Sequence, residues 1–214
     1  MVIMEHVYCF QLGAGNCYKV GRTKNSPEER KRGLSAGSPE KFELYRDLET
    51  ENAPGLEAYI HHLLDEKRAV NGEFFNVTSQ ELDEAVGRAV AFIEESLPLR
   101  HKADELRQRK PLNDTPVAAS PAMLKTYRQL RRLRREKYLM EQQIRFLESK
   151  IQVAIGEAVG MQGIASWKWV SRLALDIDRF KAEQEALYQA YLRESGSRRF
   201  CLDRVDLGEE DPEG

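Results

Sequence analysis

The chain has 214 residues, of which 41% are hydrophobic and 32% charged, with a formal net charge of -2. This length allows one large or two small domains, and the composition is typical of a soluble globular protein with a strongly charged surface. A membrane protein is excluded, because no apolar run approaches the roughly 20 residues that a membrane-spanning helix needs.

Cysteine usage and the N-terminus indicate where the protein works. Cys9, Cys17 and Cys201 form no CxxC pair, so neither a disulfide framework nor a zinc site is expected. The N-terminus lacks a basic start followed by an apolar stretch, so no signal peptide is expected. Together these features predict a reduced, cytoplasmic location.

Residues 5–10 and 17–21 are predicted as paired strands around the turn Gly13–Asn16. Ser26 followed by Pro27 and Glu29 is an N-cap signal for a helix to about Leu34. Alternation predicts a strand over 42–48, and apolar spacing predicts a helix over 53–67. An extended piece at 72–77 and a helix from Thr78 or Ser79 through Ser96 follow. The predicted fold class is therefore α+β, a small antiparallel sheet flanked by helices.

The second half of the chain has a different character. Four prolines lie from Leu97 to Pro121, so we expect a first domain at 1–97 and a linker at 98–121. From Leu130 apolar residues recur at alternating spacings of three and four, which predicts a long helix in a coiled coil or helical hairpin. A second helix over 171–193 would complete the hairpin in a domain at 122–205. The acidic residues 206–214 are expected to be a disordered tail.

The first strands carry side chains that a purely structural hairpin would not need. His6-Val7-Tyr8 and Lys19-Val20-Gly21 stand where the two signature tripeptides of the GIY-YIG nucleases stand, and this stretch resembles that superfamily. Tyr18–Thr23 is similar to the "Tyr-Lys-Ile-Gly-Arg-Thr" of its phage-type branch, and Gly72–Phe75 to the branch's "Gly-Glu-Trp-Phe".

The resemblance implies a metal-dependent DNA endonuclease that hydrolyses phosphodiester bonds. It implies Tyr8 beside the attacking water and Arg30 on the scissile phosphate. It also implies Glu57 as the ligand of one Mg²⁺ ion, with Mn²⁺ as a substitute. A phenol with a pKa of about 10 needs a nearby cation to act as a base. We expect Lys19, which replaces the usual tyrosine of the second motif, to supply that cation.

Further residues are expected to contact DNA. Arg22 follows the second motif, and His61 lies one helical turn after Glu57, as in the phage-type branch. Asn76 takes the position of the family's late asparagine. Glu73 is expected to be structural or to face the substrate. Tyr18, displaced by one residue from the motif, should point to the opposite sheet face and pack there.

Residues 120–203 resemble, more weakly, the helical C-terminal segment of YqaJ-type phage recombinases. The matching features are the basic helix, Ile155–Ala158, Trp167-Lys168, Asp176 and Arg199-Phe200. The carboxylates of that family's nuclease domain have no counterpart here, so this resemblance implies no catalysis. It fits a protein of a bacterial or phage-infected cell.

Charge is distributed unevenly between the halves. Residues 1–97 hold roughly 11 basic and 17 acidic side chains, and the remainder is near +4. Because neutralising phosphates supplies most non-specific DNA affinity, the helix carrying Arg131 and Arg135 could hold the DNA. The same charges could equally form an ordinary solvated helix face.

Two functions remain open from the sequence. One is the endonuclease, with the helices of 122–195 binding DNA, a second copy of the chain or a protein partner. The other is a non-catalytic phage or prophage accessory factor that binds DNA or protein on a GIY-YIG scaffold.

Overall fold

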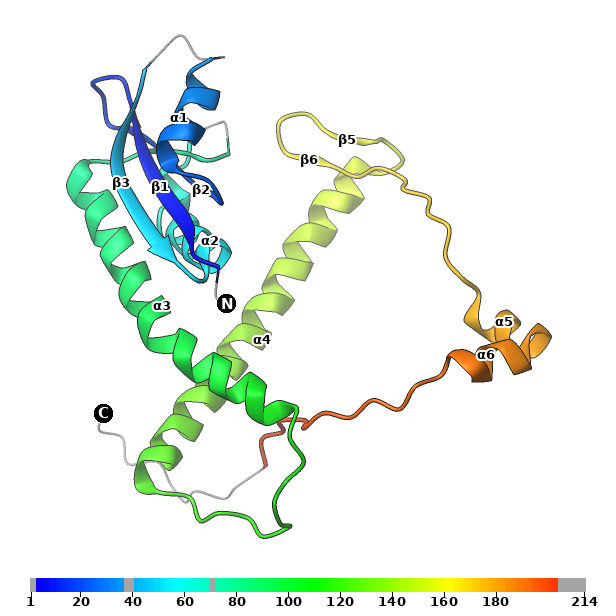
Figure 1. Cartoon of the computed structure of the whole chain (residues 1–214). Coiled ribbons are helices and arrows are strands. Elements are labelled where there is room, and N and C mark those ends of the chain that lie inside the picture. The colour runs from blue at the N-terminus through cyan, green and yellow to red at the C-terminus, as the bar shows by residue number, and fades with distance from the viewer. Residues whose placement is uncertain (1–2, 37–40, 70–71, 204–214) are drawn as a thin grey trace. The chain divides into compact units, whose positions relative to one another are not determined.

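The computed structural model describes residues 3–36, 41–69 and 72–203 (Figure 1). The predicted tail at 206–214 lies outside these residues. The chain divides after Lys110 into two compact units, and residues 197–203 belong with the first of them. No helix in the described part of the chain has the length and apolar character to cross a membrane.

The first unit is an antiparallel sheet with helices, which confirms the predicted α+β class. Its elements in chain order are β1 (Glu5–Leu12), β2 (Cys17–Thr23), α1 (Pro27–Ser35), β3 (Phe42–Thr50), α2 (Ala53–Leu63), a 3₁₀ turn (Asp65–Lys67), β4 (Phe74–Asn76) and α3 (Ser79–Arg107). The strand order is β3-β1-β2-β4, and each pair is antiparallel.

The two faces of the sheet carry different cores. Val7 and Cys9 of β1 face the main core, where they meet Leu56 and Ile60 of α2 and the buried stripe of α3. The alternate residues of β1 face a smaller cluster with Phe42, against which Leu34 of α1 packs. Because strand side chains alternate, α1 and α2 cover opposite faces of the same sheet.

Local capping signals set where the helices begin. The Ser26 hydroxyl accepts a hydrogen bond from the Glu29 N–H at 3.3 Å, as predicted for α1. Thr78 and Glu81 form a reciprocal capping box at the start of α3.

Two predicted helix ends are wrong. Residues 64–67 leave the α2 helix and form the 3₁₀ turn, while α3 continues past Ser96 and through Pro98 to Arg107. A proline removes one backbone hydrogen bond from a helix interior. The buried residues of α3 between Leu82 and Ile93 hold the helix firmly before Pro98, and the helix tolerates the loss.

The second unit is dominated by α4 (Pro121–Ile155), which confirms the predicted long helix. Gly156 ends it at a φ of 61°, a left-handed conformation that favours glycine. Beyond it lie a small hairpin of β5 (Gly160–Met161) and β6 (Ala165–Ser166), then α5 (Ile177–Glu183) and α6 (Glu185–Tyr191).

The predicted extent of the second helix, 171–193, is wrong, while the hairpin that it would form with α4 stays a prediction. Residues 171–176 are not helical, and Gln184 has a non-helical backbone between α5 and α6. The stripe on α4 stays open, with Leu133, Met140 and Leu147 each about half exposed or more. Short helices are marginal without a packed apolar face, which explains why the predicted helix is broken.

Candidate functional site

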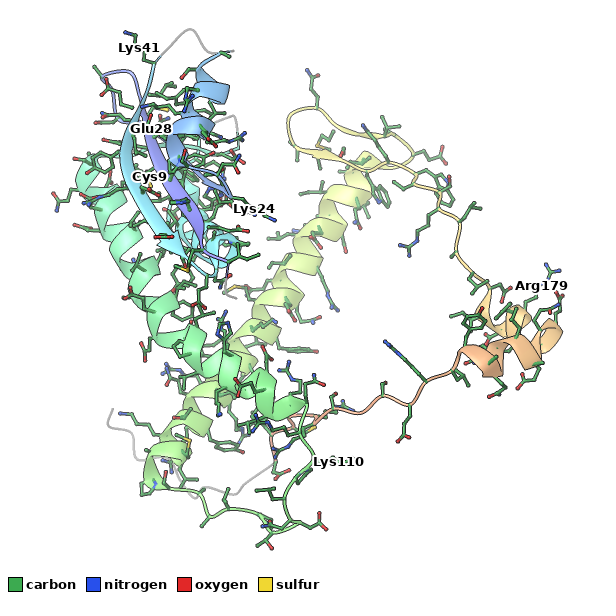
Figure 2. All side chains as sticks on the ribbon, viewed as in Figure 1. Cys9, Lys24, Glu28, Lys41, Lys110 and Arg179 are labelled. Atoms are coloured by element: carbon green, nitrogen blue, oxygen red, sulfur yellow. The ribbon has the colours of Figure 1, made fainter. Side chains whose placement is uncertain are left out.

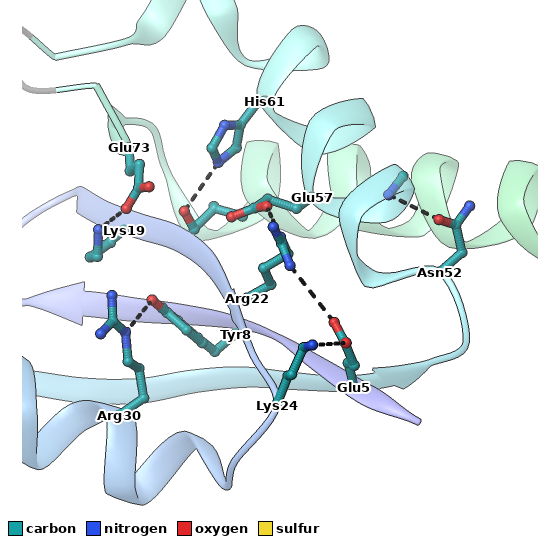
Figure 3. Close-up of polar contacts among 12 residues, drawn as sticks. Glu5, Tyr8, Lys19, Arg22, Lys24, Arg30, Asn52, Glu57, His61 and Glu73 are labelled. Atoms are coloured by element: carbon teal, nitrogen blue, oxygen red, sulfur yellow. Dashed lines mark hydrogen bonds and ion pairs between the residues drawn. The ribbon is translucent and has the colours of Figure 1, made fainter. Parts of the chain in front are cut away.

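The edge of β2 forms a cleft because β4 is short. β4 pairs only with Cys17–Lys19, so the following residues of β2 border an open edge of the sheet. A cleft of about 380 Å³ lies there (Figure 3). Residues from both sheet faces reach it, because an edge is accessible from either side. Its lining comprises Tyr8, Gly21, Arg22, Thr23, Lys24, Arg30, Glu57 and Glu73.

Tyr8 is held from two sides. It lies opposite Gly21 in the β1–β2 register and is only 1% exposed. A Cβ atom at Gly21 would lie 2.5 Å from the Tyr8 Oη, so glycine is what leaves room for the phenol. Phe10 stacks on the ring at 4.3 Å between centroids. The phenol is therefore fixed with its oxygen at the cleft.

Arg30 approaches the same phenol from α1. The Ser26 cap starts this helix, and Arg30 lies one turn in, with its N–H bonded to the Ser26 carbonyl at 3.2 Å. Its Nε donates to the Tyr8 Oη at 3.3 Å. That hydrogen bond is the main reason why the pKa of Arg30 is raised. The guanidinium is exposed, so it can also meet an anion from solvent.

Glu57 reaches the cleft from α2, the helix on the opposite sheet face. Asn52 caps this helix by accepting from the Gly55 N–H at 3.1 Å, and Glu57 follows in the next turn. Its carboxylate accepts a hydrogen bond from the Nε of Arg22 at 3.0 Å. Arg22 and Lys24 both also lie 3.8 Å from the carboxylate of Glu5. The result is a chain of alternating charges along the open edge of β2.

Lys19 does not line the cleft. Its side chain is 7% exposed, its ammonium is paired with Glu73, and it lies 5.0 Å from the centre of the Phe74 ring. The cation that contacts the Tyr8 oxygen is therefore Arg30, and the structure gives Lys19 a carboxylate as its partner. The hydrogen bond from Lys19 is the largest cause of the lowered pKa of Glu73.

Glu73 is the residue whose place sequence reasoning left undecided. It lines the cleft while holding Lys19 beneath it. The motif Gly72–Phe75 was the available signal, but it does not reveal which lysine the carboxylate meets. Glu5 and Lys24 were missed, since exposed charges at strand ends are common and carry no motif.

Tyr18 points away from the cleft, as predicted. It is buried in the main core, with its ring edge-on to Tyr45 at 5.2 Å between centroids. Burial is the main cause of the raised pKa of Tyr18. Of the two residues weighed for the second motif, only Lys19 is on the Tyr8 face of the sheet.

The remaining predicted DNA contacts lie outside the cleft lining. The Nε2 of His61 donates to the carbonyl oxygen of Val20 at 3.1 Å, and the ring lies against Phe75. His61 thus satisfies an acceptor of β2 near the end of β4. Asn76 is exposed and is paired with Cys17 in the sheet. Arg131 and Arg135 are exposed on α4, in the other unit.

The donors for a metal ion are few. Within the described residues, no three His, Cys, Asp or Glu side chains are grouped as a metal cluster. A single carboxylate nevertheless fits Mg²⁺, which retains much of its hydration when protein ligands are few. Glu57 could supply this carboxylate. Arg22 donates to its Oε2, and the second carboxylate oxygen could bind the ion. Zinc and copper, which favour nitrogen and sulfur ligands, would be a poorer match than Mg²⁺ or Mn²⁺.

Residues 5–90 match the family model of the T5orf172 domain. This is a phage-associated domain with an endonuclease-type fold, and the match supports a nuclease-like family for this part of the chain. The matched residues cover the sheet, α1, α2 and the start of α3, and hence the whole cleft. Neither the curated proteins nor the solved structures gave a significant match.

Proposed function

We propose that the first unit is a metal-dependent DNA endonuclease of GIY-YIG type that hydrolyses phosphodiester bonds. The observation that supports this most directly is the convergence of Tyr8, Arg30 and Glu57 on one cleft, from β1, α1 and α2. The match to a phage-type nuclease-like domain supports DNA as the substrate.

In this proposal Arg30 binds the scissile phosphate. Its exposed guanidinium can donate two parallel hydrogen bonds to phosphate oxygens, while the bond from its Nε to Tyr8 fixes its orientation. The same bond holds the Tyr8 oxygen beside the phosphate that Arg30 would bind. Tyr8 would hold the attacking water by a hydrogen bond to its oxygen, next to that phosphate.

Glu57 would hold the Mg²⁺ or Mn²⁺ ion with its carboxylate. Such an ion supplies positive charge to the phosphate oxygens as negative charge develops there. Arg22 donates to the other oxygen of that carboxylate, and its guanidinium, 44% exposed, would also be able to contact the phosphate. Lys19 is assigned the supporting role of holding Glu73 at the cleft wall. We extend the DNA-contacting surface to His61, Asn76, Arg131 and Arg135, as the sequence predicts.

The test is cleavage of supercoiled plasmid and labelled oligonucleotides, with Mg²⁺, with Mn²⁺ and with chelator. We expect Tyr8→Phe and Glu57→Gln each to lower the rate by about 100-fold or more. Tyr59→Phe and Glu94→Gln, which alter a phenol and a carboxylate outside the cleft lining, are the matched controls. Full activity in both cleft variants would contradict the proposal.

The ion pair between Arg22 and Glu57 favours one alternative, a DNA- or protein-binding accessory factor without catalysis. In that case the carboxylate serves only as a partner of arginine. The same experiment separates the two functions, because an accessory factor would bind DNA in Mg²⁺ and leave it intact.

A further inference from the structure

The α4 helix carries a long apolar stripe that its own unit leaves open. When Leu130 is placed at position a of a heptad, the next a and d positions form an apolar series with one charged member. They hold Leu133, Lys137, Met140, Ile144, Leu147 and Ile151. Four of these residues are at least 48% exposed: Leu133, Met140, Ile144 and Leu147. The side chains of α4 stand out around the helix in Figure 2.

Nothing else in residues 111–196 is long enough to cover this stripe. α4 has 35 residues and α5 and α6 have 7 each. At a rise of 1.5 Å per residue these lengths are roughly 50 Å and 10 Å. A helix of equal length is needed, and a second copy of α4 is such a helix.

We propose that two copies of the chain associate through α4 as an antiparallel two-stranded coiled coil, centred between Tyr138 and Leu139. In this register Leu130 meets Leu147 of the second copy, Leu133 meets Ile144, and the layers repeat symmetrically. The helix runs from Pro121 to Ile155, so its midpoint coincides with this centre and nearly the whole helix is paired.

The charge pattern selects the antiparallel orientation. In a parallel pair, Lys137 would face Lys137 of the second copy inside the seam. Glu136 at position g would face Glu141 at position e, and like charges in these places oppose pairing. In the antiparallel pair, Lys137 packs beside Met140 of the other helix, and Arg134 faces Glu141 at both symmetric places.

The outer face of the helix supports the same conclusion. All three acidic residues of α4, Glu136, Glu141 and Glu148, lie at positions e and g. Positions b, c and f hold no acid, but six cations: Lys125, Arg128, Arg131, Arg132, Arg135 and Arg145. Five of these six lie in the first half of the helix. An antiparallel pair separates the two basic halves to opposite ends, whereas a parallel pair would force them together.

The test is the molar mass of the full-length chain in solution, measured by sedimentation equilibrium over a range of concentrations. We expect a dimer for the natural chain and a monomer for Leu133→Asp/Ile144→Asp. These two side chains are exposed in the structure, so the variant should fold, and circular dichroism checks this. A natural chain that stays monomeric over the whole concentration range would overturn the proposal.

Charge reversal tests the orientation. Glu141→Arg places two arginines together in the antiparallel pair, so we expect about a tenfold weaker association. Combining it with Arg134→Glu restores the pairing. Arg135→Glu, a reversal at the neighbouring outer position, is the control and leaves association unchanged. In a parallel pair Glu141→Arg would instead meet Glu136 and tighten the dimer, and that result would overturn the antiparallel arrangement.

Discussion

At the scale of single residues, the contact between Gly21 and Tyr8 is the most sensitive feature of the cleft. Gly21→Ala introduces a Cβ that would lie 2.5 Å from the phenol oxygen. The ring must move, and its hydrogen bond with Arg30 then breaks. We expect cleavage to fall by about tenfold or more, because a shift of one ångström in a reacting group has effects of that size. The melting temperature should also fall, because displacing a buried side chain by overpacking costs about 1–3 kcal/mol.

Gly33→Ala is the control for this substitution. Gly33 lies in α1, and an added Cβ meets no atom within 4 Å. It should leave cleavage unchanged and stabilise the helix slightly. If Gly21→Ala cleaved DNA as fast as the natural chain, the exact position of the Tyr8 phenol would not matter for cleavage.

The pair of Lys19 and Glu73 predicts a pH-dependent stability. Because Lys19 lowers the pKa of Glu73 from 4.5, the ionised carboxylate stabilises the folded state above that value. This contribution is lost as the pH falls through the lowered folded-state pKa. Glu73→Gln should therefore destabilise the fold at neutral pH and differ less from the natural chain at about pH 3. Denaturant unfolding at several pH values measures the difference.

The size of that effect comes from the lysine. Glu73→Gln leaves a buried ammonium without its partner, which costs about 2 kcal/mol. Lys19→Met/Glu73→Gln removes both charges and should be more stable than Glu73→Gln alone. If the double variant were the less stable of the two, the pair would not be the source of the stabilisation.

At the scale of elements, the capping box of α3 should govern how firmly the helix begins. Thr78→Ala removes the hydroxyl that accepts from the Glu81 N–H at 3.2 Å. We expect a loss of about 1 kcal/mol in the free energy of unfolding. Ser79→Ala, one residue later and exposed, is the control and should be nearly neutral. Comparable losses in the two variants would mean that the cap is not what stabilises the helix.

How well the sequence predicts an element depends on where its information lies. α1 and α3 begin where Ser26 and Thr78 predict, because capping is a local interaction. The end of α3 was predicted wrongly because the sequence shows the local helix-breaking signal of Pro98. It does not show the tertiary packing that keeps the helix intact beyond that residue. The helix expected over 171–193 failed for the opposite reason: its apolar spacing is present, but α5 and α6 pack only against each other to any extent.

The cleft could be predicted only in part, for a related reason. The resemblance to a nuclease family implied Tyr8, Arg30 and Glu57, and these three line the cleft together. The expectation that Lys19 would be the cation beside the phenol does not match its observed partner, Glu73. The two residues are 54 positions apart, and only the short pairing of β4 with β2 brings them together. That Glu57 reaches round the sheet edge from the opposite face likewise depends on where β4 ends.

At the scale of the whole molecule, we expect the basic outer face of α4 to contact DNA, because the first part of the chain carries more acidic than basic side chains. Changing Arg128, Arg131, Arg132 and Arg135 together to Gln should weaken binding and reduce its salt dependence. If all four contact phosphates, the slope of log affinity against log salt falls in magnitude by roughly 3 to 4. Fluorescence anisotropy with a labelled duplex measures this slope.

The control is Arg172→Gln/Arg179→Gln, which removes exposed cations outside α4 and should leave the slope unchanged. An unchanged slope in the fourfold variant would mean that the face is merely solvated, and that the first unit holds the DNA by itself.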